Sequence, residues 1–251
     1  MKDNQKFNNL LITIITVGTI FVLWAAAAFA VSSEYVLPSV SKTFTALFSL
    51  LGDGEFYLAL SMTLIRSLIA FSLSFVMAFL LSLLSINNKT AERVIAPIIA
   101  IIRSLPTVAI VLLLLFWTDS KIAPVIVTML VVMPTLYTNL YSALDGVDKT
   151  AVEAGLVDGA DNKKCFIYIR LPQALPAVYS SVGGGISLNI KLMVAAEVIA
   201  ATANSLGFLL NSSKVYFEIA TMLAIVLITV VIGCIVEGVF NKLSKKAGEW
   251  K

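Results

Sequence analysis

The stretch from Leu144 to Pro176 reads LDGVDKTAVEAGLVDGADNKKCFIYIRLPQALP, and it is the longest polar interruption in an otherwise apolar chain. Apolar runs flank it on both sides, Ile122–Ala143 before it and Ala177–Ala203 after it. A transmembrane helix needs about 20 predominantly apolar residues, so each run is long enough to cross a bilayer. The stretch therefore predicts a loop outside the membrane between two spans.

The composition of the whole chain agrees with this interpretation. Hydrophobic residues make up 59% of the 251 residues and charged residues only 13%, which is about half the charged share of a soluble domain. Four further apolar runs predict spans at Leu10–Val31, Tyr57–Leu84, Val94–Trp117 and Ile219–Phe240. The first run is expected to be a retained helix, with a cleaved signal peptide as the alternative. The predicted fold class is an all-α polytopic membrane protein of about six transmembrane helices.

Residue types that are scarce in the chain exclude several classes of chemistry. The chain has no histidine, which excludes His-based catalytic triads and His-rich metal sites. Its two cysteines are too few for a disulfide framework or a four-cysteine zinc site. The formal net charge of +3 is too small to indicate nucleic acid as a partner.

The distribution of the basic residues predicts the orientation. With the N-terminus inside, twelve of the 18 lysines and arginines fall on inner segments, three on outer segments and three within spans. Basic residues accumulate on the cytoplasmic side of membrane proteins. We therefore expect a multi-pass protein of the bacterial cell membrane, with both termini in the cytoplasm and residues 144–176 on the same side.

The first half of the 144–176 loop carries the signals of a short helix. Asp148 is a good N-cap residue before a helix at Thr150–Val157. Gly159 is expected to end this helix, because glycine adopts the left-handed conformation at little cost.

The second half repeats the pattern. Asp161 can cap a helix at Asn162–Ile169, and Pro172 and Pro176 are expected to end it before the next span. The loop is thus predicted to be two helices around a glycine hinge. Several of its side chains are apolar although they lie outside the bilayer, so the loop should dock on a partner: Leu156, Val157, Phe166, Ile167 and Ile169.

The remaining divisions of the chain follow from the spans. We expect an N-terminal end with the first span at residues 1–31, an outer loop at 32–56, a transmembrane domain at 57–240 and a basic tail at 241–251. Within the outer loop, Ser39–Leu51 has apolar residues at helical spacing and predicts a short amphipathic helix. This helix either lies on the outer membrane surface or packs on the bundle.

The 144–176 loop resembles the EAA signature of ABC importer permeases. The matching residues are Glu153-Ala154-Gly155, then Gly159-Ala160, then Phe166, Ile169 and Leu171-Pro172. The third position departs from the family pattern, because Gly155 stands where alanine is usual. Both residues are small, so close approach of two helices is expected to survive.

The rest of the chain is similar to the permeases of nitrate, sulfonate, taurine and thiamine-precursor importers. The residues that carry this resemblance are Leu37-Pro38, Pro97, Leu105-Pro106, Gly185-Ile186-Ser187-Leu188, Ala196-Glu197 and Leu206-Gly207. The chain departs from the subgroup at Thr118, where glycine is frequent, and at Ile190-Lys191, where Ser-Trp is frequent.

The resemblance implies a mechanical role and a set of partners. The loop would be a coupling helix seated in a cytoplasmic ABC ATPase dimer, with Glu153 and Gly159 at the contact. A second permease copy, identical or related, and an extracytoplasmic solute-binding protein would complete the importer. The chain contains no Gly-Lys dipeptide and so no Walker A motif. We therefore expect no enzyme activity and no directly bound cofactor, with ATP and magnesium held by the partner ATPase.

Five charged residues fall inside predicted spans, and Glu237 lies so near an inner end that its carboxylate is expected to reach the membrane surface. The other four lie deeper, where a charge costs about 3 kcal/mol on translocon scales. They are Arg66, Arg103, Lys191 and Glu197. Lys191 and Glu197 are six residues apart, about 120° around a helix, so they cannot pair along one face. Two interpretations are open. In the first, Glu197 pairs with Arg66 or Arg103, and Lys191 reaches a helix carbonyl. In the second, the cations line a path for an anionic or strongly polar solute.

Two polar neighbours, Ser187 and Asn189, could add hydrogen bonds to such a path or serve helix packing. The solute itself stays open among nitrate, a sulfonate such as taurine, a carboxylate, a thiamine precursor and a riboflavin-like compound. The alternative function is an ion-coupled secondary transporter. That class would explain intramembrane charges without ATP, but it gives the 144–176 loop no purpose and usually shows internal repeats.

Overall fold

The computed structural model describes the backbone of residues 2–248 and the side chains of residues 11–248. Within this range the chain forms helices and no strand, which confirms the predicted fold class. The helices group into two compact units. One comprises the chain up to Tyr57 together with Leu209–Ile228, and the other comprises Leu58–Phe208 with the chain from Thr229 onward.

In the first unit, helix α1 (Lys2–Val31) is joined to the short helix α2 (Val40–Leu51). Ser39 caps α2 by accepting a hydrogen bond from the backbone of Lys42, so the helix predicted at Ser39–Leu51 is present. The indole of Trp24 donates a 3.2 Å hydrogen bond to the carbonyl of Pro38. These contacts hold the start of α2 against the end of α1.

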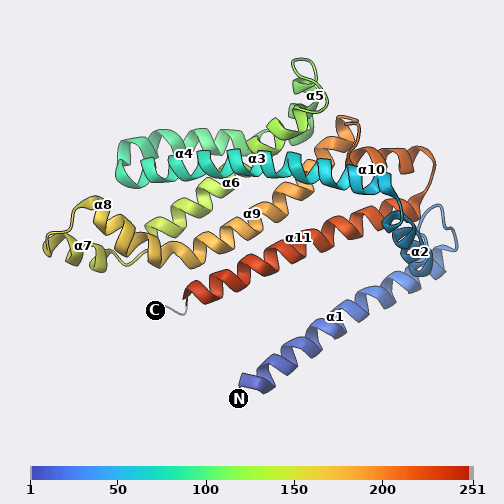
Figure 1. The fold of residues 1–251 in the computed structure, drawn as a ribbon, viewed down its shortest axis with the longest axis horizontal. Coiled ribbons are helices and arrows are strands. Elements are labelled where there is room, and N and C mark those ends of the chain that lie inside the picture. Colours follow the sequence, from blue (N-terminus) through green and yellow to red (C-terminus); the bar gives the residue numbers. More distant parts are fainter. Residues whose placement is uncertain (1, 249–251) are drawn as a thin grey trace. The chain divides into compact units, whose positions relative to one another are not determined.

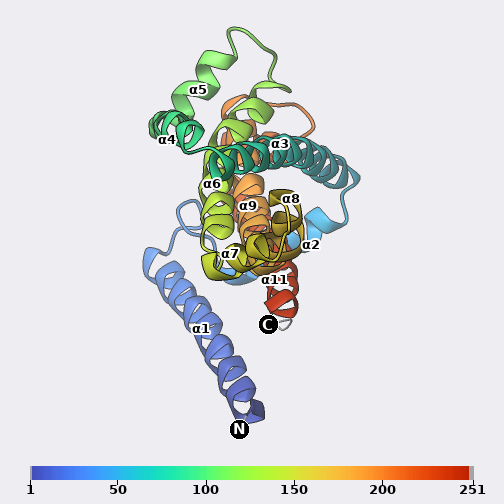
Figure 2. The ribbon, with the colours of Figure 1, turned by 90° about the vertical axis from the view of Figure 1, so that its left-hand side faces the viewer.

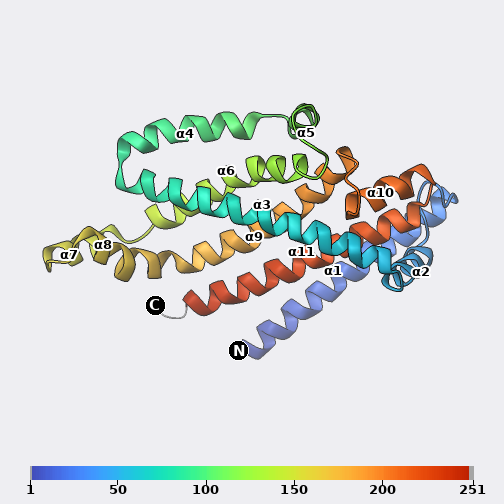
Figure 3. The same cartoon turned by 45° about the horizontal axis from the view of Figure 1, so that its top comes forward.

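The second unit is built around two long helices, α6 (Ala123–Asp145) and α9 (Leu171–Ile199), which lie side by side (Figure 1). Most of α3 (Gly54–Asn87) belongs to this unit, and α4 (Lys89–Ser104) folds back next to α6 (Figure 3). Asn88 makes the turn between α3 and α4, because its side-chain oxygen caps the first amides of α4.

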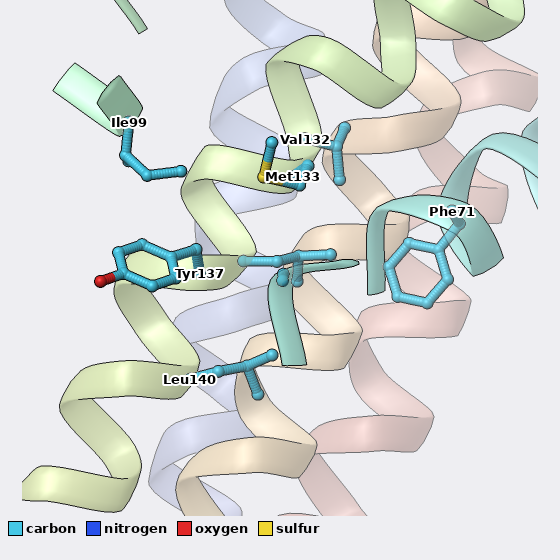
Figure 4. Packing of buried hydrophobic residues seen from close by; sticks show 8 residues of the cluster. Phe71, Ile99, Val132, Met133, Tyr137 and Leu140 are labelled. Carbon is cyan, nitrogen blue, oxygen red and sulfur yellow. The ribbon is translucent and has the colours of Figure 1, made fainter. Parts of the chain in front are cut away.

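The core of this unit is apolar and centred on α6. Figure 4 shows Val132, Met133, Tyr137 and Leu140 of α6 packed between Phe71 of α3 and Ile99 of α4. All of these side chains are buried. Lipid tails are as apolar as these side chains, so van der Waals packing rather than exclusion from water holds the cluster together. The cluster anchors the helices that carry the candidate site.

The run of glycines in α9 allows close helix packing, as expected for small residues at membrane interfaces. A Cβ added at Gly185 would lie 2.6 Å from Leu136, and one at Gly183 would lie 2.6 Å from Phe240. In the part of the chain that the structure describes, nothing lies within 4 Å of a Cβ at Gly184. Two of the three glycines are therefore required by close neighbours.

The third predicted span is broken, which its apolar composition did not predict. The helices α4 and α5 (Thr107–Leu114) meet at an angle of 85°. Leu105 and Pro106 between them have extended backbones. Pro106 lacks an amide hydrogen and disfavours helical geometry in the preceding residue, which accounts for the break.

The prolines at the end of the 144–176 loop do not end a helix, and that prediction is wrong. Helix α8 (Asn162–Cys165) passes through a π-helical turn, η1 (Phe166–Arg170), directly into α9. Pro172 lies in the first turn of α9, where a missing amide hydrogen is tolerated. Pro176 lies inside α9, and its carbonyl accepts a 2.7 Å hydrogen bond from the Ser244 hydroxyl.

After α9, a short loop leads to α10 (Leu206–Val215), which the sequence analysis did not anticipate, and then to α11 (Ile219–Gly248). α11 continues through the described part of the basic tail. In the described residues, five helices are long and apolar enough to cross a membrane, and six segments if α4 and α5 form one broken span. This count agrees with the prediction of about six.

Candidate functional site

The 144–176 loop forms a compact projection at one end of the second unit, beyond α6 and α9 (Figures 1 and 2). Asp148 caps α7 (Lys149–Val157) by accepting a hydrogen bond from the Thr150 amide. Gly159 follows with a φ of +86°, a conformation that favours glycine. Asp161 then caps α8 through the Lys164 amide. The two caps and the glycine turn confirm the local prediction.

The projection has a small core of its own. Leu144, Val147, Val152, Cys165 and Ala174 are buried together. Phe166 and Ile169 pack against this cluster, so these two side chains stabilise the projection itself. The expectation that all five apolar residues of the loop face a partner is therefore corrected for Phe166 and Ile169.

Gly155 has a structural reason to be glycine. A Cβ at this position would lie 2.6 Å from Cδ1 of Ile169 and 3.3 Å from Sγ of Cys165. The second helix of the loop thus crosses α7 where alanine would force its neighbours to move. This close crossing explains the departure from the EAA pattern.

Four other apolar side chains of the loop are exposed. We call Leu156, Val157, Ile167 and Tyr168 the exposed apolar face of the loop, and their exposed fractions include 87% for Val157 and 75% for Tyr168. Tyr168 was not among the residues that the sequence analysis singled out. Of the EAA-like residues, Glu153, Ala154, Gly159 and Pro172 are exposed, whereas Gly155, Ala160 and Leu171 are half-buried.

A second constellation lies at the far end of α9 and contains a buried ion pair. Nη1 of Arg66 lies 2.9 Å from Oε1 of Glu197, and both side chains are at least nine-tenths buried. The Thr63 hydroxyl donates a 2.8 Å hydrogen bond to the other carboxylate oxygen. Thr63 and Arg66 are three residues apart and so share one face of α3.

The same residues hold the loop between α9 and α10. The guanidinium of Arg66 donates 3.4 Å hydrogen bonds to the carbonyls of Ala203 and Asn204. The Leu206 amide donates a 2.9 Å hydrogen bond to the Thr63 hydroxyl. Asn204 has a φ of +52°, in the left-handed region. These hydrogen bonds therefore hold the loop against α3.

Gly207 adds a steric requirement at this point. A Cβ there would lie 2.4 Å from Cβ of Glu197 and 2.5 Å from the backbone nitrogen of Val198. Because the second neighbour is backbone, the contact cannot be relieved by rotating a side chain. α10 thus starts in direct contact with the end of α9.

The other two intramembrane cations have different surroundings. Lys191 is exposed on α9, and Arg103 is exposed at the end of α4. Within the described residues, neither takes part in a salt bridge. Arg103 lines a pocket of about 220 Å³ with Glu92, Tyr137 and Tyr141. The structure therefore brings Arg66 and Glu197 together and leaves Lys191 and Arg103 separate.

The two polar candidates on α9 are directed into helix packing. Asn189 is buried, and its amide nitrogen donates a 2.8 Å hydrogen bond to the Ser67 carbonyl. Ser187 of α9 is buried and lies close to Gly233 of α11. A Cβ added at Gly233 would lie 3.0 Å from the Ser187 hydroxyl. Sequence reasoning missed Ser67 and Thr63. Thr63 could have been found, because it lies three residues before Arg66 and so shares a helix face with it.

Comparisons with known proteins agree on one family. The family model described as "Binding-protein-dependent transport system inner membrane component" matches residues 80–248. The chain is 24% identical to the putative aliphatic sulfonates transport permease protein SsuC of Escherichia coli, over 86% of this chain and 82% of that one. It is 22% identical to the taurine transport system permease protein TauC of Escherichia coli, over 94% and 89%.

Solved structures show the same fold. An amino acid ABC transporter matches with a TM-score of 0.65 at 18% identity, covering 82% of this chain and 96% of the other. An inward-facing MetNI methionine ABC transporter matches with a TM-score of 0.64 at 16% identity, covering 74% and 93%.

Proposed function

The chain belongs to the family of binding-protein-dependent transport system inner membrane components. We propose that it is the permease of an ATP-driven importer and moves a small anionic solute. The observation that carries the proposal is the exposed apolar face of the 144–176 loop. An exposed apolar patch on an otherwise polar projection marks a contact site. We assign this face to a groove of a separate ATPase subunit, which would bind ATP and magnesium.

The proposal of an anionic solute rests on the two exposed intramembrane cations. An unpaired cation within a span is costly unless it faces a water-filled path or a partner. Arg66 is paired with Glu197. Lys191 and Arg103 are therefore the cations available for a solute. The relatives named for aliphatic sulfonates and taurine make a sulfonate the first candidate to test.

The partners follow from the same reasoning. One chain offers one coupling loop, so an ATPase pair with two grooves requires two permease chains, and we propose two identical copies. A solute-binding protein would deliver the solute on the outer side. The charge bias of the loops supports a bacterial inner membrane with both termini in the cytoplasm.

The first experiment tests the contact with the ATPase. The full chain is co-expressed with its candidate ATPase, and co-purification is compared for wild type and Val157→Glu. Val157 is 87% exposed, so the substitution should leave the fold intact but place a charge in the apolar contact. We expect the ATPase to be lost. Lys121→Glu, at an exposed position in the predicted outer loop, is the matched control and should retain it.

The second experiment separates an ATP-driven importer from an ion-coupled carrier. Uptake of radiolabelled taurine is measured in proteoliposomes that contain the chain, the ATPase and the binding protein. ATP-dependent uptake that survives an uncoupler supports the proposal. Uptake that requires an ion gradient and ignores ATP would assign the chain to the secondary transporters.

A further inference from the structure

A pocket of about 340 Å³ lies within the second unit, between α3, α9 and α11. Most of its lining is apolar, including Leu64 and Phe71 of α3, Ile186 of α9, and Ile232 and Val236 of α11. None of the lining residues is charged. The pocket is therefore chemically distinct from the surroundings of Lys191 and Arg103.

Two buried polar atoms in this pocket have no hydrogen-bond partner among the described residues. They are Oγ of Ser67 and Oδ1 of Asn189, and both residues also line the pocket. Ser67 is 3% exposed and Asn189 is 1% exposed. A buried polar group without a partner loses its hydrogen bonds to water and gains none in return, so native proteins normally satisfy such atoms.

The orientation of the Asn189 amide follows from its one hydrogen bond. Its nitrogen donates to the Ser67 carbonyl, so its oxygen is the free atom and can only accept. The Ser67 hydroxyl can donate or accept. A matching ligand must therefore supply at least one donor. A hydroxyl group meets both requirements, whereas an ionised sulfonate or carboxylate has no donor and would face the oxygen of Asn189.

The size and the location of the pocket select the rest of the ligand. Apolar cavities of about 150 Å³ already bind molecules such as benzene, and this pocket is larger. Leu68 forms part of the wall and is 66% exposed in the single chain, on a helix that is long and apolar enough to cross a membrane. A molecule dissolved in the bilayer thus has a direct approach to the pocket.

We propose that this pocket binds a neutral, hydroxyl-bearing amphiphile that enters from the bilayer. The hydroxyl group donates to Oδ1 of Asn189 and accepts from Oγ of Ser67, and the alkyl chain fills the apolar part between α3, α9 and α11. The ligand bridges three helices of one chain, and its site is separate from the proposed path of the transported solute.

The test uses the full chain in lipid nanodiscs and 3-azioctanol, a photoactivatable alkanol. Labelled positions are mapped by peptide mass spectrometry. We expect saturable labelling of residues 64–71 in α3 and 232–236 in α11, with competition by 1-octanol. A diazirine alkane of equal length without the hydroxyl group should label the lipid-facing surface without saturation. Equal saturable labelling by both probes would overturn the role of the polar atoms.

Variants of the pocket sharpen the test. Ser67→Ala should weaken 1-octanol competition about five-fold, which corresponds to about 1 kcal/mol for one hydrogen bond. Ser72→Ala is the matched control, because Ser72 is exposed on the same helix and does not line the pocket. Ile232→Phe should block labelling by filling the pocket. Unchanged labelling in Ile232→Phe would contradict the proposed position of the ligand.

One further competitor tests whether the pocket selects a neutral head group over an anionic one. 1-Octanesulfonate has the same alkyl chain with an anionic head group, and we expect it to compete poorly. Competition as strong as that of 1-octanol would mean that the pocket accepts the anionic class and would overturn the proposal of a neutral ligand. Should Ser67→Ala fail to fold, the competition on wild type and the Ile232→Phe result still decide.

Discussion

Removal of Arg66 is expected to be the most destabilising single charge deletion in the spans. In Arg66→Met the long apolar side chain is largely kept, but the buried carboxylate of Glu197 loses its counterion. The carbonyls of Ala203 and Asn204 lose their donors at the same time. Breaking a buried ion pair by removing one partner costs about 3–5 kcal/mol.

The matched control is Arg103→Met. It removes the same charge from another span, but Arg103 is exposed and has no salt bridge in the described residues. We expect a cost below about 1 kcal/mol, as for exposed charges. The contrast therefore isolates the pairing of Arg66 from the general cost of an intramembrane charge.

The assay is the thermal unfolding midpoint of each purified variant, followed by size-exclusion chromatography after heating. For a protein of this size, 1 kcal/mol corresponds to about 2–4 °C, so Arg66→Met should lower the midpoint by about 6–20 °C. Arg103→Met should shift it by less than about 4 °C. Equal shifts for the two variants would refute the assignment of Arg66 as a structural pin.

Three further predictions concern the loop, the start of α10 and the proposed solute path. Gly155→Ala should destabilise the loop by about 1–3 kcal/mol through overpacking, measured as faster hydrogen exchange at residues 144–176. Adding Ile169→Val should restore the protection, and a failure to restore it would mean that Ile169 is not the obstacle. Gly207→Ala should abolish folded expression because its Cβ meets backbone, whereas Gly184→Ala should be tolerated; similar yields of both would argue against the close approach. Lys191→Ala should lower taurine uptake about ten-fold while ATPase co-purification is unchanged, and undiminished uptake would remove Lys191 from the solute path.

The spans were predictable because bilayer thickness sets a simple requirement on apolar length. Five helices meet it outright, and the broken pair α4 and α5 accounts for the sixth segment. The break between α4 and α5 is caused by Pro106, whose effect on the backbone is not visible in the pattern of apolar residues. Hydropathy records which residues can enter lipid, but it does not record where a missing amide hydrogen bends a helix.

The local predictions in the 144–176 loop succeeded where a single side chain decides the backbone. Asp148 and Asp161 cap their helices, and Gly159 takes the left-handed conformation. The prediction that Phe166 and Ile169 face a partner is wrong, because a loop sequence does not reveal that the loop encloses a core of its own. Such a division between core and surface depends on the crossing of α7 with the second helix.

The intramembrane charges mark the limit of sequence reasoning most clearly. Arg66, Arg103 and Lys191 all lie deep in predicted spans, and composition treats them alike. In the fold, Arg66 is buried against Glu197, whereas Lys191 and Arg103 are exposed. Pairing across 131 positions of sequence is decided by helix packing, so only the tertiary structure can separate a structural cation from one that is free to meet a solute.

The continuity of the chain from the loop into α9 changes how the two candidate sites are related. With a proline stop, the exposed apolar face of the loop and the ion pair would lie on separate elements. Instead, one helical segment runs from Asn162 to Ile199, a length of about 55 Å at 1.5 Å per residue. The apolar face is at one end of this segment, and Glu197, pinned by Arg66, is at the other. A displacement imposed on the loop would therefore reach the pinned loop before α10 without crossing a flexible hinge.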